Sequence, residues 1–289
     1  MKKFIFTFYI LLSVLFTRAQ NGLENIIVEK YYISNANDTA NSIIGGTLPI
    51  GSITYRIYAN MLPGYKFQAA FGIPDHMLKI ATTTTFFNNE YKGRNSGNVI
   101  PYINLKENTV MLDSWLSTGA ASEGTVGVPK EDDDTTSTIV HEQKFLLNDN
   151  KEAGIPLKTR DGMRIVGVGK TPKMTYFGID NDLRPFHNRS LDSSFTTTNG
   201  SWACLGGAAG PDSLSNKVLI AQITTDGVFS FELNIQIGTP YRGVERYVAK
   251  NPKPNEIQIP SLIYESVQTK SESSNNKKKK KNDIELTKP

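Results

Sequence analysis

The stretch KVLIAQITTDGVFSFELNIQIG, from Lys217 to Gly238, carries the strongest structural pattern in the chain. Asp226 and Gly227 divide it into two extended arms. An Asp-Gly pair between two apolar runs is the strongest short-range signal for a hairpin with a type I′ turn. The sequence therefore predicts two antiparallel strands that pair with each other around residues 226 and 227.

The second arm alternates between apolar and polar residues, which predicts one buried face and one face in solvent. The first arm, Val218 to Ile223, is apolar on both faces apart from Gln222 and is typical of a central strand covered on two sides. The expected buried set is Phe229, Phe231, Leu233, Ile235 and Ile237, and the expected solvent set is Ser230, Glu232, Asn234 and Gln236.

Short extended segments separated by turn residues continue through the rest of the chain, and no stretch of a dozen residues shows a clean helical period. This pattern predicts an all-β fold: an antiparallel β-sandwich, jelly-roll-like, with few or no helices, in one domain over residues 20–265. We expect strands at 22–34, 52–61, 65–71, 76–89 and 109–118, a meander pairing of 52–61 with 65–71, a long exposed loop at 120–138, and a closing strand at 261–264.

The first nineteen residues have the three parts of a signal peptide. Lys2 and Lys3 precede an apolar run from Phe4 to Phe16, and Thr17-Arg18-Ala19 supplies a small-residue cleavage site. The run is too short for a membrane span, which takes about 20 apolar residues. The sequence therefore predicts export to the cell surface or the extracellular space, with no transmembrane segment in the mature chain.

Residues 266–289 are rich in Lys, Ser and Asn and hold too few apolar side chains to fold, so a disordered tail is expected. Two roles remain open for it: a solvated tail, or an electrostatic tether to anionic envelope polymers or lipids. The tether residues would be Lys277, Lys278, Lys279, Lys280 and Lys281. Between the two ends, acidic residues slightly outnumber basic ones, which argues against nucleic-acid binding.

The residues suited to metals or nucleophilic chemistry are few and scattered. A single cysteine, Cys204, excludes an intramolecular disulfide, and its apolar neighbours indicate a buried, inert thiol. The three histidines, His76, His141 and His187, are far apart, with no second ligand at metal spacing. No cofactor is expected apart from Ca²⁺.

The candidate for Ca²⁺ is the pair Asp180 and Asp182, whose oxygens suit this ion. The segment lacks the glycine and the distal glutamate of an EF-hand loop, so a simple turn capped by an Asp side chain is the alternative.

Enzymatic groups are equally hard to find. There is no Gly-x-Ser-x-Gly motif for a nucleophilic serine. Glycoside hydrolysis needs two facing carboxylates, whose positions in sequence are unconstrained. Glu90, Asp113 and Glu232 are candidates for such a pair.

The two tryptophans, Trp115 and Trp202, are the best candidates for ligand contact. If exposed, their flat faces would stack on sugar rings. The alternative is that both are buried between two sheets, because their neighbours are small and apolar.

Several stretches together resemble one known family. They are GSITYRIYANMLPGYKFQAAFG (51–72), TTTTFFNNE (82–90), VMLDSWLSTGA (110–120), NGSWACLGGAAGP (199–211) and the opening stretch extended to Pro240. They resemble uncharacterised secreted β-rich domains of Bacteroidota, which often lie at the N-terminal side of large surface proteins that end in a type IX secretion sorting domain. The resemblance implies a secreted β-rich domain and assigns no activity or catalytic residue. The chain differs from the usual layout in its lysine-rich end.

Two hypotheses for function follow from these observations. The first is a secreted or cell-surface module, non-enzymatic, with a structural or adhesive role. The alternative is a carbohydrate-binding module or a glycan-active enzyme. The partner would be a surface glycan or another surface protein.

Overall fold

The computed structural model describes residues 21–40, 45–46, 48–107, 109–136, 139, 146, 150–157, 159–212 and 214–267. The signal peptide expected at residues 1–19, His141 and the run Lys277 to Lys281 lie outside these residues. The described part of the chain holds one α-helix, α2 (Ala36–Ala40), and is built mainly from strands. In that same part, no helix is long and apolar enough to cross a membrane.

The strands of the described residues form four sheets, in which every pairing is antiparallel except that of β15 with β16. The central sheet has the order β1 (Leu23–Ile33), β2 (Ile53–Met61), β12 (Asn216–Thr225), β5 (Trp115–Leu116). The six-stranded sheet has the order β16 (Glu256–Gln258), β15 (Val244–Val248), β14 (Ile235–Gly238), β3 (Lys66–Gly72), β11 (Gly200–Ala208), β9 (Met174–Phe177). The end sheet has the order β10 (Ser194–Thr197), β4 (Leu78–Thr82), β13 (Phe229–Glu232), β17 (Ile263–Glu265), and the small sheet has the order β6 (Ala120–Ser122), β7 (Thr125–Gly127), β8 (Met163–Ile165).

Short 3₁₀ turns connect many of these strands. They are η2 (Gly97–Val99), η3 (Tyr102–Lys106), η4 (Val110–Leu112), η5 (Lys130–Asp132), η7 (Lys151–Ala153), η8 (Arg184–Phe186) and η9 (Pro260–Leu262). The fold is therefore the all-β sandwich that the sequence predicts, with helical structure confined to short pieces.

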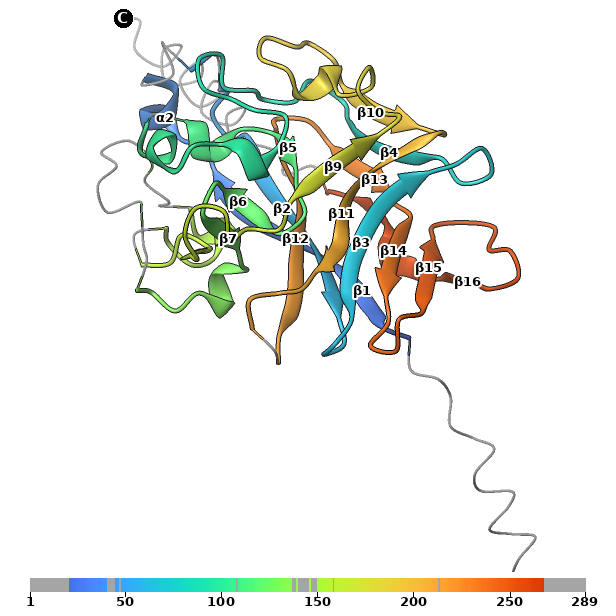
Figure 1. Ribbon diagram of the computed structural model, residues 1–289. Coiled ribbons are helices and arrows are strands. Elements are labelled where there is room, and N and C mark those ends of the chain that lie inside the picture. The colour runs from blue at the N-terminus through green and yellow to red at the C-terminus, as the bar shows by residue number, and fades with distance from the viewer. Residues whose placement is uncertain are drawn as a thin grey trace, which may run out of the picture.

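The central sheet is the middle layer, because it buries apolar side chains on both faces. On one face, Ile57 and Ile220 belong to a core that also contains Trp202 and Ile235 of the six-stranded sheet. On the other face, Leu219 belongs to a second core, formed with residues of the 3₁₀ turns and the small sheet. Figure 1 shows the six-stranded sheet in front of β1, β2 and β12. The prediction that the first arm is a central strand covered on two sides is confirmed.

The hairpin predicted at Asp226-Gly227 is wrong. β12 pairs with β2 and β5 in the central sheet, whereas β13 pairs with β4 and β17 in the end sheet. A type I′ turn needs positive φ at both central residues, and neither Asp226 nor Gly227 has one. Threonine hydroxyls hold this bend: Thr84 Oγ1 donates to Asp226 Oδ1 at 2.6 Å, and the Val228 N–H donates to Thr83 Oγ1 at 2.9 Å.

The second arm keeps its buried face but changes sheet midway. All five of its apolar side chains are buried, with exposed fractions of 3% or less, as predicted. The polar face, however, is interrupted at Asn234, which is buried between β13 and β14. Its amide group donates to the carbonyls of Phe71 (3.1 Å) and His76 (3.0 Å), and its Oδ1 accepts the Ala249 N–H at 3.1 Å. These bonds stabilise the crossing from the end sheet to the six-stranded sheet.

The meander of 52–61 with 65–71 is also wrong. β2 pairs with β1 and β12, and β3 pairs with β11 and β14, so the turn at Pro63-Gly64 carries the chain from one layer to the other. The strand expected at 76–89 is shortened to β4, because the following threonines bond to the bend at residue 226. The strand expected at 109–118 is shortened to β5 and follows the 3₁₀ turn η4.

The long exposed loop predicted at 120–138 is wrong for its first half. β6 and β7 lie there, and Ala120, Ala121 and Val128 are buried. Its glycines reflect close packing: a Cβ atom built on Gly127 would lie 2.2 Å from Leu219 Cδ2 of the central sheet. Small residues here allow the segment to cover the second face of the central sheet.

Candidate binding surface on the six-stranded sheet

The outer face of the six-stranded sheet carries apolar side chains that no other layer of the described residues covers. Side chains alternate along β11, so Trp202 and Cys204 point into the core while Ser201, Ala203 and Leu205 point outward. Leu205 is 74% exposed, and Phe177 on the neighbouring strand β9 is 47% exposed. Large exposed apolar groups gathered on one face are typical of interaction sites.

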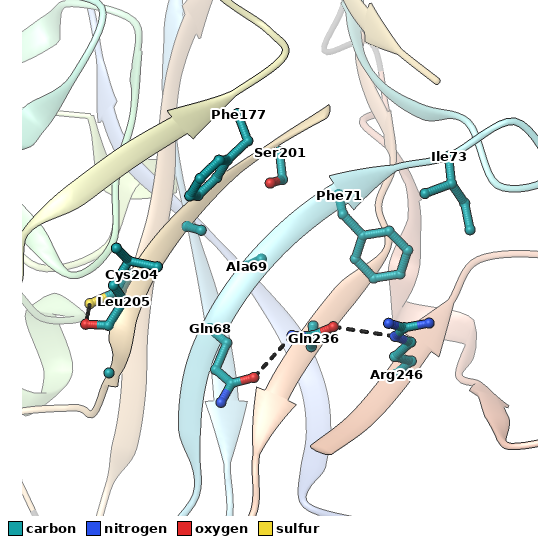
Figure 2. Close-up of a pocket in the computed structure, with 12 residues that line it drawn as sticks. Gln68, Ala69, Phe71, Ile73, Phe177, Ser201, Cys204, Leu205, Gln236 and Arg246 are labelled. Carbon is teal, nitrogen blue, oxygen red and sulfur yellow. Dashed lines mark hydrogen bonds between the residues drawn. The ribbon is translucent and has the colours of Figure 1, made fainter. Parts of the chain in front are cut away.

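These side chains line a depression of about 490 Å³ (Figure 2). Ser201 is opposite Phe71 on β3 and opposite Phe177 on β9, so the two phenylalanines flank it on either side. Strands are about 4.8 Å apart, which places the two Phe backbones about 10 Å from each other. Ala69 and Ala203 form the next row of the floor. We call this hollow the sheet-face depression.

A relay of three polar side chains forms one side of the depression (Figure 2). Arg246 Nε donates to Gln236 Oε1 at 3.2 Å, and Gln236 Nε2 donates to Gln68 Oε1 at 3.0 Å. Because the arginine only donates, the oxygen of Gln236 must face it, and the order of donors and acceptors in the whole relay follows. The groups left for a ligand are therefore mainly donors.

The charge of Arg246 is not neutralised inside the depression. None of the residues that line it is acidic. The neighbouring Glu245 lies on the other side of β15, where its Oε2 accepts the Gly22 N–H at 2.9 Å and the Tyr247 hydroxyl at 2.5 Å. Within the described part of the chain, Arg246 is bonded through Nε only. The site thus combines two aromatic rings, a floor of small residues and an available guanidinium.

The tryptophans proposed for ligand contact are both buried, Trp115 with 2% and Trp202 with 0% exposure. Trp202 lies beneath the depression on the inner face of β11, where its Nε1 donates to the Ser117 carbonyl at 3.1 Å. Trp115 belongs to the second core. Neither ring has a free face for stacking on a sugar, so the structure agrees with the alternative that both are core residues.

The candidate calcium ligands lie in a turn before η8. Asp180 is exposed and Asp182 half-buried, and the Asp182 N–H donates to the Ile179 carbonyl at 2.8 Å. Among the described residues, no three His, Cys, Asp or Glu side chains come together as a metal site would require. A Ca²⁺ site at Asp180 and Asp182 stays a prediction.

The other sequence candidates occupy structural positions. His76 is buried, with Nε2 2.9 Å from Glu256 Oε2, while His187 is exposed. Cys204 is a buried free thiol, and burial raises its pKa, which disfavours the reactive thiolate. The prediction of a buried thiol is confirmed.

The three candidate carboxylates each have separate partners. Glu90 pairs with Arg189 at 3.0 Å, and Glu232 pairs with Lys250. Asp113 is buried and accepts two backbone N–H groups, at 2.7 Å each. Burial raises the pKa of Asp113 to about 8 despite these bonds. None of the three lines the sheet-face depression.

A second group of titratable side chains lies between the central and small sheets. Arg56 is buried, stacks 3.6 Å above the Tyr31 ring, and donates to Gln222 Oε1 and the Gly162 carbonyl, both at 2.9 Å. Lys130 Nζ donates to the Tyr31 carbonyl at 2.7 Å, and burial lowers the pKa of Lys130 to about 8. These bonds join two layers of the protein, so we assign the group a structural role.

Sequence reasoning missed Phe71, Phe177 and the polar relay. The alternation of Trp202 and Cys204 with Ser201, Ala203 and Leu205 is visible in the sequence and separates two faces of a strand. It does not reveal that one of these faces remains uncovered. That depends on where distant segments pack.

The chain matches no protein-family model, no curated protein and no solved structure. Function is therefore inferred from the residues of the site.

Proposed function

We propose that the protein is a non-enzymatic adhesive module that acts outside the cytoplasm and binds polysaccharide through the sheet-face depression. The observation that carries this proposal is the pair Phe71 and Phe177, which flank a floor of small residues on an uncovered sheet face. This proposal combines the two hypotheses from the sequence, because adhesion would result from carbohydrate binding at this site. Export depends on the predicted signal peptide.

The composition of the depression suits a sugar chain. Ligand sites are mostly apolar, with a few placed polar groups that set orientation. Phe71 and Phe177 offer ring faces that pack against the C–H faces of sugars, while Gln68, Gln236 and Arg246 offer hydrogen bonds to hydroxyl oxygens. All of these residues lie on strands, and a rigid surface loses little entropy when it binds.

Binding without turnover is favoured by the residues that line the depression. Glycoside hydrolysis requires two carboxyl groups on either side of the bond that breaks, and no lining residue is acidic. Ser201 has no histidine beside it among the lining residues, and the Cys204 thiol is buried with a raised pKa. The site therefore holds a ligand and supplies no group to cleave it.

Affinity electrophoresis tests this proposal. The protein would be run through native gels that contain xylan, laminarin, mannan or polygalacturonate. We expect at least one polymer to retard the wild-type protein and the double variant Phe71→Ala/Phe177→Ala to migrate freely. The matched control is Val168→Ala/Leu191→Ala, which removes two exposed apolar side chains outside the depression and should be retarded like the wild type.

Circular dichroism would establish that both double variants are folded. The proposal fails if none of the four polymers retards the wild-type protein. It also fails if a folded Phe71→Ala/Phe177→Ala variant is retarded as strongly as the wild type.

A further inference from the structure

The polar side of the sheet-face depression indicates which kind of polysaccharide binds there. We infer that the ligand is a glycan whose sugars carry carboxylate groups, as uronic acids do, and that Arg246 binds the carboxylate. This inference rests on the proposed function, because it names the substrate class of the same site. It depends on three observations: the direction of the hydrogen-bond relay, the engagement of the carboxylates near Arg246 by other groups, and the paired edges of the floor strands.

The relay leaves nitrogen donors at both of its ends without a bond among the described residues. Arg246 uses only Nε in its bond to Gln236, so its two terminal nitrogens are available as a planar fork. At the other end, Gln68 presents Nε2 beside Gly238, where a Cβ atom would lie 2.6 Å from it. A carboxylate accepts two parallel N–H bonds from a guanidinium fork, which a neutral hydroxyl does not reproduce.

The carboxylates nearest Arg246 are engaged by other groups. Glu256, the partner of Arg246 across β15 and β16, accepts the Lys253 N–H at 2.8 Å and lies 2.9 Å from His76 Nε2, outside the depression. No acidic residue lines the depression, and the Glu245 carboxylate is engaged on the opposite side of β15. Lys66 is exposed on β3, two residues from Gln68, and adds a second positive charge beside Gly207. Two cations whose neighbouring carboxylates are engaged by other groups attract an anionic ligand.

The floor of the depression favours a sugar chain over an acidic peptide. β3 is paired with β14 and β11, and β11 is paired with β3 and β9, so neither floor strand has an open edge. A peptide that adds to a sheet does so through backbone hydrogen bonds at an open edge. A ligand on this face must instead use its own ring faces and acceptor oxygens, which a carboxylated sugar has.

Isothermal titration calorimetry with two forms of one oligosaccharide tests the inference. The probes are oligogalacturonate and the same oligosaccharide fully methyl-esterified, which keeps the rings but removes the charge. We expect the wild-type protein to bind the acid form at least about tenfold more tightly, as a charge-assisted pair would give. Added salt should weaken binding of the acid form and leave that of the ester nearly unchanged.

Two variants locate the effect. Arg246→Gln should bind both forms with the affinity that the wild type has for the ester. Arg242→Gln is the matched control, because it removes the same charge four residues away on an exposed turn outside the depression, and it should keep the preference.

Equal affinity of the wild-type protein for the acid and the ester would overturn this inference and leave polysaccharide binding intact. Full preference for the acid in Arg246→Gln would overturn the role of Arg246. Polyglutamate that displaces the oligogalacturonate as well as the free sugar acid does would overturn the assignment to a glycan. Failure of the proposed function would give a different result. Either neither form of the oligosaccharide would bind to the wild-type protein, or the Phe71→Ala/Phe177→Ala variant would bind both forms as tightly as the wild type does.

Discussion

Replacement of Asn234 tests how the chain crosses from the end sheet to the six-stranded sheet. In Asn234→Ala, the carbonyls of Phe71 and His76 and the N–H of Ala249 lose a buried partner. Each buried group left unsatisfied costs about 1–3 kcal/mol, and partial rescue by water brings the expected loss to about 3–5 kcal/mol. For a domain of this size, that loss lowers Tm by roughly 10 °C.

Urea denaturation followed by fluorescence would measure the change in the free energy of unfolding. Asn234→Asp should be worse than Asn234→Ala at neutral pH, because a carboxylate offers no hydrogen to the carbonyls and adds a buried charge. It should recover partly in acid, where the protonated carboxyl regains one donor. The matched control is Asn25→Ala on β1, an exposed asparagine whose loss should cost under about 0.5 kcal/mol. A loss below about 1 kcal/mol in Asn234→Ala, or an Asn234→Asp variant as stable as wild type, would refute the reasoning.

Three further predictions concern titratable groups. Asp113→Asn should destabilise the fold by about 1–3 kcal/mol, because its NH₂ group must face one of two backbone N–H donors. The folded pKa of Asp113 is raised to about 8 from an ordinary value near 3.8, so its stabilising contribution is full below about pH 3.8 and is lost as the pH rises to about 8. The difference in the free energy of unfolding between the wild type and Asp113→Asn, measured by urea denaturation, should therefore narrow over that range. A constant difference would contradict this reasoning. The pKa of Lys130 is lowered to about 8, so the free energy of unfolding of the wild type minus that of Lys130→Met should rise between about pH 8 and 10.5. A difference that falls over this range would count against the assignment. The Cys204 thiol should react with a disulfide reagent far more slowly in the native than in the urea-unfolded protein, and equal rates would show it to be accessible.

The alternation of side chains along strands could be predicted from sequence because it is a local property. The five apolar residues from Phe229 to Ile237 are buried as their period of two requires. The same holds for β12, whose two apolar faces follow from its position in the middle layer.

Strand partners could not be predicted, because they depend on residues far apart in the chain. Asp226-Gly227 has the composition of a tight turn, yet hydroxyls of Thr83 and Thr84 bond to this bend from over 140 positions away. Asn234 follows the alternating pattern of an exposed residue and is buried because backbone groups of Phe71, His76 and Ala249 bond to its amide. Local signals are overridden when a buried polar group finds all its partners.

The candidate binding surface could not be predicted from the sequence for the same reason. Phe71 and Phe177 are brought together by β11, which pairs with the strand of each. The tryptophans attracted attention because of their residue type, and both are buried in the core. The informative feature is a set of ordinary side chains on a sheet face that is exposed in the part of the chain that the structure describes.

The most direct test of the central claim is an NMR titration with fragments of the polysaccharide that retards the protein most strongly. We predict that the largest shift changes occur at the amides of Ala69, Ser201 and Ala203 and at the side-chain N–H groups of Gln68, Gln236 and Arg246. Changes that cluster on the small sheet or along β1, with these signals unmoved, would contradict the account.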